Sequence, residues 1–454
     1  MMAGTLSKAA ESMRGTLHGE DLSFRGVSTD TRSLKPGELF VALQGPNFDG
    51  AKFVAQAEAC NAAAAVVPNP VETSLPTIVV DDTLAALGKL AASWRQQMPA
   101  TVIGITGSNG KTTLKELLAS CLSVSDPTLA THGNLNNEIG LPLMLLRMAE
   151  NHRYAVIEMG ANHPGEIAYL ASLASPRVVA ITNAAPAHLE GFGSVEGVAR
   201  AKGEIIVGKE NPECVILNAD DDYFEYWNSL AVDAEVISFG LSAEADVRAS
   251  GIEATVGGST FTLHMPDSQF SVTLALQGKH NVLNACAAAA IARSLGISDQ
   301  QIQKGLQAVQ PFDGRLQPVI SPSGAMLFDD SYNANPVSVQ AAAEFLATQK
   351  GVTWLVLGDM AELGGDGALL HAHTGWVVRE SGVTNLLATG ALSKNTVEAF
   401  GDNGRWYEGI DDLIADLQKS IGDGDVVLVK GSRSTGMERV VDALTDSLDK
   451  VGSG

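Results

Sequence analysis

The 454-residue sequence has few cysteines, few positive charges and no long apolar runs. Its four cysteines are widely spaced and form no CxxC pair, which argues against a disulfide framework or a zinc site and favours buried thiols in a reducing compartment. The longest strongly apolar stretches, such as residues 285–292, are far shorter than the roughly 18–20 residues of a membrane span. The N-terminal segment MMAGTLSKAAESMRG has no apolar signal core. These absences predict a cytoplasmic protein without a membrane span.

Positive charge is the scarcer sign, because 30 Lys and Arg stand against 52 Asp and Glu and give a formal net charge of −22. Nucleic-acid binding needs a basic face, so we expect no nucleic-acid partner. A small phosphate ligand is still compatible with this charge, since a few cations and backbone amides can hold it. Apolar residues make up 45% of the chain, enough to bury several cores.

The central part of the chain alternates short apolar runs with helical patterns. The runs at residues 101–106, 154–157, 178–182 and 214–217 suit parallel strands that are covered on both faces. Helices are predicted between them, at residues 112–122 and 198–207, and a further helix over 83–98 leads into the series. This pattern predicts a doubly wound α/β domain with a mostly parallel sheet over residues 83–312.

Two smaller α/β segments flank this domain. After a turn at Phe312-Asp313-Gly314, strands are predicted at 354–357, 386–389 and 426–429, which indicates a Rossmann-like domain over residues 313–454. Residues 28–50 are rich in Gly, Pro and Asp between short strand-like pieces such as 39–43. They belong to a predicted small α/β domain over residues 1–82. The expected fold class is therefore three-domain α/β.

The sharpest motif is GITGSNGKTT at residues 104–113, where a strand runs into a glycine turn and a helix starts at Lys111. Glycines let backbone N–H groups surround a phosphate, and the helix N-terminus adds partial positive charge. Lys111 can reach the outer phosphates, and the Thr112 hydroxyl can ligate Mg²⁺. Ile105 stands where the strict Walker motif has glycine, so the match is to a shorter GxxGKTT pattern. A plain glycine turn is the alternative.

Three further side chains follow the predicted strands. Glu158 comes directly after the strand 154–157, at the sheet edge where open α/β folds bind ligands, and can hold Mg²⁺ or cap the next turn. His188 follows the next strand and is either a ligand or a loop or core histidine. Lys202 lies on the helix after that, where a lysine is usually solvated.

Amides and cations gather in three later segments. Asn281 and Asn284 share a face at the start of an Ala-rich helix, so they either contact a base or, for Asn281, cap the helix. Residues 328–336 (FDDSYNANP) indicate a ligand loop or a capped turn before a helix. Arg315 and the segment 430–433 (KGSR) supply cations for phosphate or carboxylate, or belong to a solvated surface.

Taken together, these segments resemble the Mur ligases, ATP-dependent amide-bond ligases of bacterial cell-wall synthesis. They span nearly the whole chain in the family's order, which makes the set more specific than any one motif. The matching segments are TGSNGKTT (106–113), GNLNNEIGLP (133–142), EMGANHPGEI (158–167), AHLEGFGS (187–194), AKGEI (201–205), GKHNVLNACAAA (278–289), GRL (314–316) and DSYNANP (330–336).

Within the family, the resemblance favours the activity that joins D-alanyl-D-alanine to a UDP-N-acetylmuramoyl-tripeptide through an acyl phosphate. The segments STDTR (28–32) and GDMAELG (358–364) carry it, and the DNPR motif typical of the relative that adds the third residue is absent. Ala51 follows Phe48-Asp49-Gly50, at a position where relatives often have His. The sequence therefore differs from the family pattern at one residue expected to contact the nucleotide sugar. The alternatives are a Mur ligase that adds a single amino acid, a P-loop kinase or NTPase, and a nucleotide-gated scaffold.

The resemblance implies roles for the charged residues. Lys111 would hold the ATP phosphates, and Thr112 and Glu158 would bind one Mg²⁺. His188 and Lys202 would bind a second Mg²⁺, with Lys202 carrying a carbamate made from CO₂. The expected catalytic residues are therefore Lys111, Glu158, His188 and Lys202.

The resemblance also implies binding residues for ATP and for the substrates. Asn281 and Asn284 would contact adenine. Arg315 would touch a phosphate, and Asp330 the ribose. The remaining ATP contacts would be Gly107, Ser108, Asn109, Gly110 and Thr113. Expected substrate contacts are Thr29, Asp30, Thr31, Arg32, Asn136, Asn137, Asn333 and Asn335.

The two flanking domains receive substrate roles from the same resemblance. Residues 1–82 would grip the UDP-linked sugar, and residues 313–454 would position D-alanyl-D-alanine. The expected partners are these small molecules, and the protein is expected to be a monomer.

Overall fold

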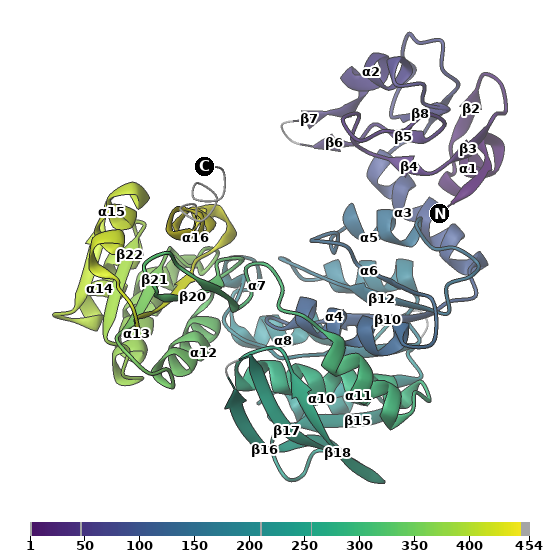
Figure 1. Ribbon diagram of the computed structural model, residues 1–454. Helices are drawn as coiled ribbons and strands as arrows, with labels where there is room; N and C mark the ends of the chain where they lie inside the picture. Colours follow the sequence, from purple (N-terminus) through teal and green to yellow (C-terminus); the bar gives the residue numbers. More distant parts are fainter. Residues whose placement is uncertain (1, 46–47, 209–210, 256, 446–454) are drawn as a thin grey trace, which may run out of the picture.

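The computed structural model describes residues 2–45, 48–208, 211–255 and 257–445, which form three α/β units with one main sheet each (Figure 1). The outer limits of the predicted domains, Met1 and residues 446–454, lie outside the described residues. The three-domain α/β fold class is confirmed.

The central unit is built on a nine-stranded sheet in the order β11-β12-β10-β13-β14-β15-β16-β17-β18. The strands from β11 to β16 run parallel, and β16, β17 and β18 form antiparallel hairpins. Their bounds are β10 Thr101–Thr106, β11 Thr128–Ala130, β12 Tyr154–Glu158, β13 Val178–Ile181, β14 Cys214–Asn218, β15 Glu235–Gly240, β16 Val247–Thr255, β17 Gly258–Met265 and β18 Ser268–Leu274.

Helices cover both faces of this sheet because each buried strand is apolar on both sides. Ile103 and Ile105 face one core together with α4, α10 and α11, whereas Val102 faces the other with α3, α5, α6 and α8. The helices span α3 Thr83–Gln97, α4 Lys111–Ser123, α5 Gly140–Leu145, α6 Glu166–Ala174, α7 Leu189–Phe192, α8 Val195–Gly203, α9 Phe224–Leu230, α10 Lys279–Ser294 and α11 Asp299–Ala308.

The N-terminal unit has a five-stranded sheet in the order β2-β9-β8-β5-β4. Helix α3 runs from this unit onto the central one, and the small unit projects from the rest of the molecule (Figure 1). Its elements are β1 Ala3–Thr5, α1 Leu6–Met13, β2 Thr16–His18, β3 Ser23–Arg25, β4 Val27–Ser28, β5 Leu39–Val41, β6 Gln44–Gly45, β7 Phe48–Asp49, α2 Val54–Ala59, β8 Ala64–Val67 and β9 Thr77–Val79.

The C-terminal unit has a six-stranded sheet in the order β19-β20-β24-β21-β22-β23, parallel except for the edge strand β19. Helices α12, α13 and α14 cover one face, and α15 and α16 the other. The bounds are β19 Gln317–Ile320, β20 Met326–Asp330, α12 Pro336–Ala347, β21 Thr353–Leu357, α13 Gly367–Glu380, β22 Asn385–Thr389, α14 Ser393–Phe400, β23 Gly404–Tyr407, α15 Ile410–Ser420, β24 Val426–Lys430 and α16 Glu438–Thr445.

Two predicted elements differ from the structure by more than one residue at an end. The helix expected over 198–207 is α8, which begins at Val195 and ends at Gly203, and the strand expected over 39–43 is β5, which ends at Val41. In both cases the apolar run continues past the element, because the next residues still pack inward: Ile205, Ile206 and Ala42 are buried. Apolar pattern alone therefore overestimates element length.

The cysteine and membrane predictions can be compared with the described residues. All four cysteines are free thiols, but Cys60 is only half-buried, which corrects the prediction that all are buried. No helix in the described ranges is long and apolar enough to cross a bilayer.

Candidate active site

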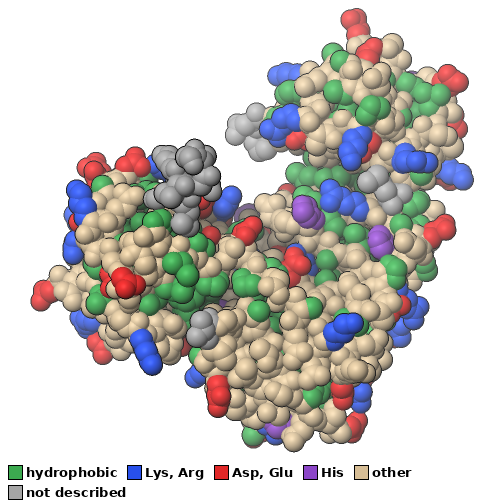
Figure 2. Space-filling view, in the orientation of Figure 1, with side chains coloured by type: hydrophobic (Ala, Val, Ile, Leu, Met, Phe, Trp, Pro, Cys, Tyr) green, Lys and Arg blue, Asp and Glu red, His purple; other side chains and the backbone are tan. Residues whose placement is uncertain are grey.

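A cavity of about 1200 Å³ lies between the central and C-terminal units, with the phosphate loop in its wall. Figure 2 shows the surface hollowed between the C-terminal unit and the other two. The ends of β10 and β12 meet there with the loop after β20. The cavity therefore gathers residues from the two larger units, as parallel sheets do at their carboxyl edges.

The phosphate loop follows β10 and requires glycine at two positions. Gly107 has φ +144°, and a Cβ there would lie 1.9 Å from the Thr182 hydroxyl oxygen. Gly110 has φ +81°, and its Cβ would lie 2.5 Å from the Asn284 amide oxygen. Any side chain would thus collide as well as strain the backbone. The glycine turn and the helix start at Lys111 are as predicted.

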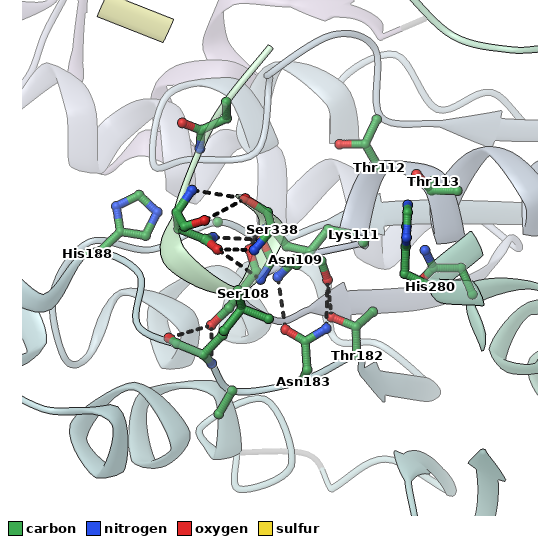
Figure 3. A pocket seen from close by; sticks show the side chains of 18 of the residues that line it. Ser108, Asn109, Lys111, Thr112, Thr113, Thr182, Asn183, His188, His280 and Ser338 are labelled. Atoms are coloured by element: carbon green, nitrogen blue, oxygen red, sulfur yellow. Dashed lines mark hydrogen bonds between the residues drawn. The ribbon is translucent and has the colours of Figure 1, made fainter. Parts of the chain in front are cut away.

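Asn109 at the loop tip is held by the residues that follow β13 and by the C-terminal unit. Its N–H donates to Asn183 Oδ1 at 3.0 Å, and its carbonyl accepts from the Thr182 hydroxyl at 2.6 Å (Figure 3). Asn335 donates its side-chain amide to Asn109 Oδ1 at 2.7 Å. Asn335 also caps α12, so the capped turn considered for this segment is present. The amide pair ties α12 to the loop.

Lys111 bends back over the loop, and its ammonium donates to the carbonyls of Gly107 at 2.7 Å and Ser108 at 3.3 Å. Burial lowers the pKa of Lys111; Glu158 opposes this effect and Arg315 adds to it. The ammonium thus lies against carbonyls that an anionic phosphate could replace as its partner.

Thr112 and Glu158 form the oxygen-rich part of the cavity wall. The Thr112 hydroxyl donates to Glu158 Oε2 at 3.0 Å, and Asn136 donates its side-chain amide to Glu158 Oε1 at 2.8 Å. Glu158 is 2% exposed and ends β12, as expected. Arg315 reaches across from the C-terminal unit and donates to the Thr112 hydroxyl at 3.0 Å. Asn137 also lines the cavity, and its Oδ1 accepts backbone N–H groups at the start of α5.

His188 lies at the cavity wall in a left-handed backbone conformation, with φ +53°. Its Nδ1 makes a close contact with the Glu362 carboxylate of the C-terminal unit. Burial lowers the pKa of His188, the Glu362 charge opposes that shift, and Lys111 and Lys202 add to it. In Figure 3, His188 and His280 lie on opposite sides of the phosphate loop.

Lys202 is 2% exposed on α8 and is not among the described residues that line the cavity. Its Nζ lies 5.2 Å from the centre of the Phe192 ring. Burial, and secondarily the Lys111 charge, lower its pKa to about 7. The solvated surface position considered for this lysine is therefore wrong, because α8 turns this face inward.

Asn281 and Asn284 are buried at the start of α10 and line the cavity near Gly110. Asn281 donates its side-chain amide to the Gln277 carbonyl at 2.7 Å. Capping of the helix by Asn281 is not observed, since the N-cap position is Gly278. A contact with adenine by either amide stays a prediction.

Asp330 and Lys430 form an ion pair at the ends of β20 and β24, in which Lys430 is buried and Asp330 half-buried. Lys430 is 4% exposed and donates to Asp330 Oδ2 at 2.7 Å and to the Asn333 carbonyl at 2.8 Å. Both strands are parallel neighbours, so register brings the two ends together. Asn333 bonds through Oδ1 to the N–H of Ala334.

Replacing Lys430 with methionine is expected to destabilise the C-terminal unit by about 3 kcal/mol, because it leaves the Asp330 carboxylate without its cation. Thermal and urea unfolding of the single variant would measure the loss. The double variant Lys430→Met, Asp330→Asn should recover part of it. A single variant within 0.5 kcal/mol of the parent would contradict the role of this pair.

The N-terminal residues predicted to contact substrate, Thr29, Asp30, Thr31 and Arg32, do not line the cavity. They follow β4 in the N-terminal unit. Arg32 donates to Asp30, which lowers the pKa of that carboxyl to about 2. The Thr31 carbonyl accepts a weak bond from the Cys60 thiol at 3.8 Å. Their role in substrate binding stays a prediction.

Sequence reasoning missed several residues of the site. Glu362 and Asn183 were not predicted, although Glu362 contacts His188 and Asn183 holds the loop tip. His280 lines the cavity, and burial lowers its pKa. Glu362 lies within the GDMAELG segment and His280 within GKHN, so both segments were noted without a role for these side chains.

Three parts of the chain match sequence models of domains from one protein family. Residues 23–95 match the Mur ligase family catalytic domain, residues 105–292 the Mur ligase middle domain, and residues 314–433 the Mur ligase glutamate ligase domain. The chain belongs to the Mur ligase family. The resemblance inferred from the motifs is thereby confirmed.

Named relatives of this Mur ligase cover almost its whole length. It is 44% identical over 450 residues to the UDP-N-acetylmuramoyl-tripeptide–D-alanyl-D-alanine ligase of Escherichia coli K12, covering 98% of this chain and 99% of the relative. The crystal structure of MurF from Acinetobacter baumannii is 36% identical, covers 98% and 99% of the two chains and superposes with a TM-score of 0.93. MurF from Thermotoga maritima in complex with ADP is 28% identical, with 94% and 98% coverage and a TM-score of 0.84.

Proposed function

We propose that this Mur ligase joins D-alanyl-D-alanine to UDP-N-acetylmuramoyl-tripeptide in peptidoglycan synthesis, at the expense of ATP. The products are the pentapeptide, ADP and phosphate. Identity of 44% along both chains to a ligase of that name is the observation that carries the proposal. The cavity supports it, because one wall has a phosphate loop and the opposite wall belongs to the C-terminal unit.

The chemistry follows from the poor reactivity of a carboxylate. A carboxylate oxygen of the tripeptide attacks the γ-phosphorus of ATP, and the bond to ADP breaks. The neutral dipeptide amine then attacks the acyl carbon of the acyl phosphate, the bond to phosphate breaks, and the nitrogen releases a proton as the amide forms. The first step brings two anions together, so charge neutralisation is the main demand. Lys111, Arg315 and the N-terminus of α4 supply it in this chain.

The oxygens of Thr112 and Glu158 fit a Mg²⁺ ion. Mg²⁺ prefers oxygen ligands together with several waters, and this hydroxyl and carboxylate lie 3.0 Å apart in the cavity wall. When bound, the ion offsets charge on the phosphate oxygens. Asn136 holds the second carboxylate oxygen, which keeps the first directed at Thr112.

His188 and Lys202 are proposed to hold a second Mg²⁺. The described residues contain no group of three His, Cys, Asp or Glu side chains that could hold a metal. A carbamate on Lys202 would add an anionic oxygen ligand, and the burial of this lysine beside Phe192 favours the neutral amine that CO₂ requires.

The roles of the three units are part of the proposal. The domain limits 1–82, 83–312 and 313–454 assign the UDP-sugar to the first unit, ATP to the second and the dipeptide to the third. Asn281, Asn284 and Asp330 would contact the nucleoside. Asn333 and Asn335, together with the N-terminal residues Thr29, Asp30, Thr31 and Arg32, would contact substrate. We propose a monomer in the cytoplasm.

The decisive experiment measures phosphate release with a panel of UDP-linked peptides and acceptors. We expect turnover only when ATP, the UDP-linked tripeptide and D-alanyl-D-alanine are all present, with a new amide in the product. Turnover with a single amino acid and a shorter UDP-peptide would instead identify another Mur ligase activity. A phosphorylated acceptor without a new amide would identify a kinase.

A further inference from the structure

Lys115 is a buried lysine on α4 that the proposed mechanism does not use. It is 1% exposed and does not belong to the described residues that line the cavity. Its ammonium donates to the Thr131 carbonyl at 2.7 Å and lies 2.6 Å from a carboxylate oxygen of Glu116. Burying an ammonium is costly unless it is well bonded, so these contacts must hold it firmly.

Thr131 connects Lys115 to the end of strand β12. All three of its polar groups are engaged: its N–H donates to the Val156 carbonyl at 3.0 Å, its carbonyl accepts from Lys115, and its hydroxyl oxygen accepts the N–H of Glu158 at 2.9 Å. Thr131 is 2% exposed. The backbone of Glu158 is therefore fixed through the residue that Lys115 holds.

The loop that begins at Thr131 also holds the carboxylate of Glu158. Five residues on, Asn136 donates its side-chain amide to Glu158 Oε1 at 2.8 Å. The backbone carbonyl of Asn136 accepts the N–H of Gly160 at 2.8 Å. The loop thus contacts both the backbone and the carboxylate of Glu158, and Lys115 holds the start of this loop.

The same helix presents the other oxygen of the proposed Mg²⁺ site. Thr112 and Lys115 are three residues apart on α4, so they lie on neighbouring turns of one face. The Thr112 hydroxyl meets Glu158 Oε2 at 3.0 Å. Helix α4 therefore controls Thr112 directly and Glu158 through Lys115 and Thr131.

We propose that Lys115 is a positioning residue that sets the distance between the Thr112 hydroxyl and the Glu158 carboxylate for a divalent cation bound with nucleotide. This inference rests on the proposed function for the identity of the cation site. It does not depend on the identity of the acceptor substrate.

The test measures binding of Mn²⁺, as a probe for Mg²⁺, to the full chain in the presence of ADP by electron paramagnetic resonance. Lys115→Met keeps the bulk of the side chain and removes the ammonium. Thr131→Val keeps the carbonyl and removes the hydroxyl that Glu158 bonds. Both are expected to weaken Mn²⁺ binding by about tenfold or more, the range found when groups that orient metal ligands are removed. Thr131→Ser, which keeps the hydroxyl, should remain within twofold of the parent.

Binding of ADP without metal separates this role from general damage to the fold. We expect it to change less than twofold in the variants that weaken Mn²⁺ binding. If metal-free ADP binding weakens as much as Mn²⁺ binding, or if Mn²⁺ binding is unchanged in Lys115→Met or in Thr131→Val, the positioning role is wrong. Should Lys115→Met fail to fold, Thr131→Val decides alone. Failure of the proposed function is distinct, because it would show as absent turnover with D-alanyl-D-alanine in the unchanged protein.

Discussion

Replacing Lys111 with alanine is expected to lower kcat by about a thousandfold or more. The ammonium is the cation that the phosphate loop itself carries, and it lies within 2.7 Å of the Gly107 carbonyl on the inner side of the loop. When the substrate carboxylate approaches the γ-phosphate, removal of this charge leaves repulsion between two anions. The loss should therefore appear in the chemical step, measured as ADP formed in a single turnover.

The matched control is Lys89→Ala, which removes an exposed lysine from α3 and should leave the rate within twofold. Lys111→Arg keeps the charge but cannot place it on the same carbonyls, so an intermediate loss is expected. Turnover by Lys111→Ala within tenfold of the parent would exclude a catalytic role and favour the nucleotide-gated scaffold.

The parts of the site that lie within one short segment could be predicted from the sequence. The phosphate loop combines an apolar strand, a glycine turn and a helix start in ten residues, so its conformation follows from local rules. Glu158 was placed correctly for the same reason, because the apolar run before it fixes where β12 ends. The parallel central sheet followed from four apolar runs with no polar face.

Contacts between distant segments could not be predicted in this way. Glu362 of the C-terminal unit contacts His188 of the central unit. The two residues are far apart in the sequence, so no pattern within either segment predicts this contact. Strands β16, β17 and β18 were also missed, since they alternate buried and exposed residues and lack the continuous apolar runs that marked the parallel strands. The helix pattern alone favoured a solvated position for Lys202, and only the family resemblance gave it a role, because the inward face of α8 depends on tertiary packing.

Residues of the site come from two of the three units. The phosphate loop, Thr112 and Glu158 come from the central sheet, whereas Arg315 and Asn335 reach the loop from the C-terminal unit. Both of these contacts are hydrogen bonds between side chains. The phosphate loop is thus held by side chains of both units.

Replacing Lys202 with alanine is expected to lower turnover by about a hundredfold or more, because the second proposed cation then loses its carboxylate ligand. The lysine nitrogen would attack CO₂, forming an N–C bond while one C=O electron pair becomes the carbamate oxygen charge and a proton leaves the nitrogen. Lys202→Glu places a carboxylate near the same position without CO₂ and should retain part of the activity. Full activity in Lys202→Ala would refute the metal role.

The pH dependence of turnover provides an independent check on the carbamate. Burial lowers the pKa of Lys202 to about 7, so the ammonium predominates below that pH and cannot attack CO₂. Turnover should therefore rise between pH 6 and pH 8, about one unit to either side of that pKa, and should fall in buffer freed of CO₂ and return when bicarbonate is added. Lys202→Glu should lose the response to bicarbonate, because its carboxylate needs no CO₂. If the unchanged protein is equally active with and without CO₂ across this range, Lys202 acts through its amine and the carbamate is excluded.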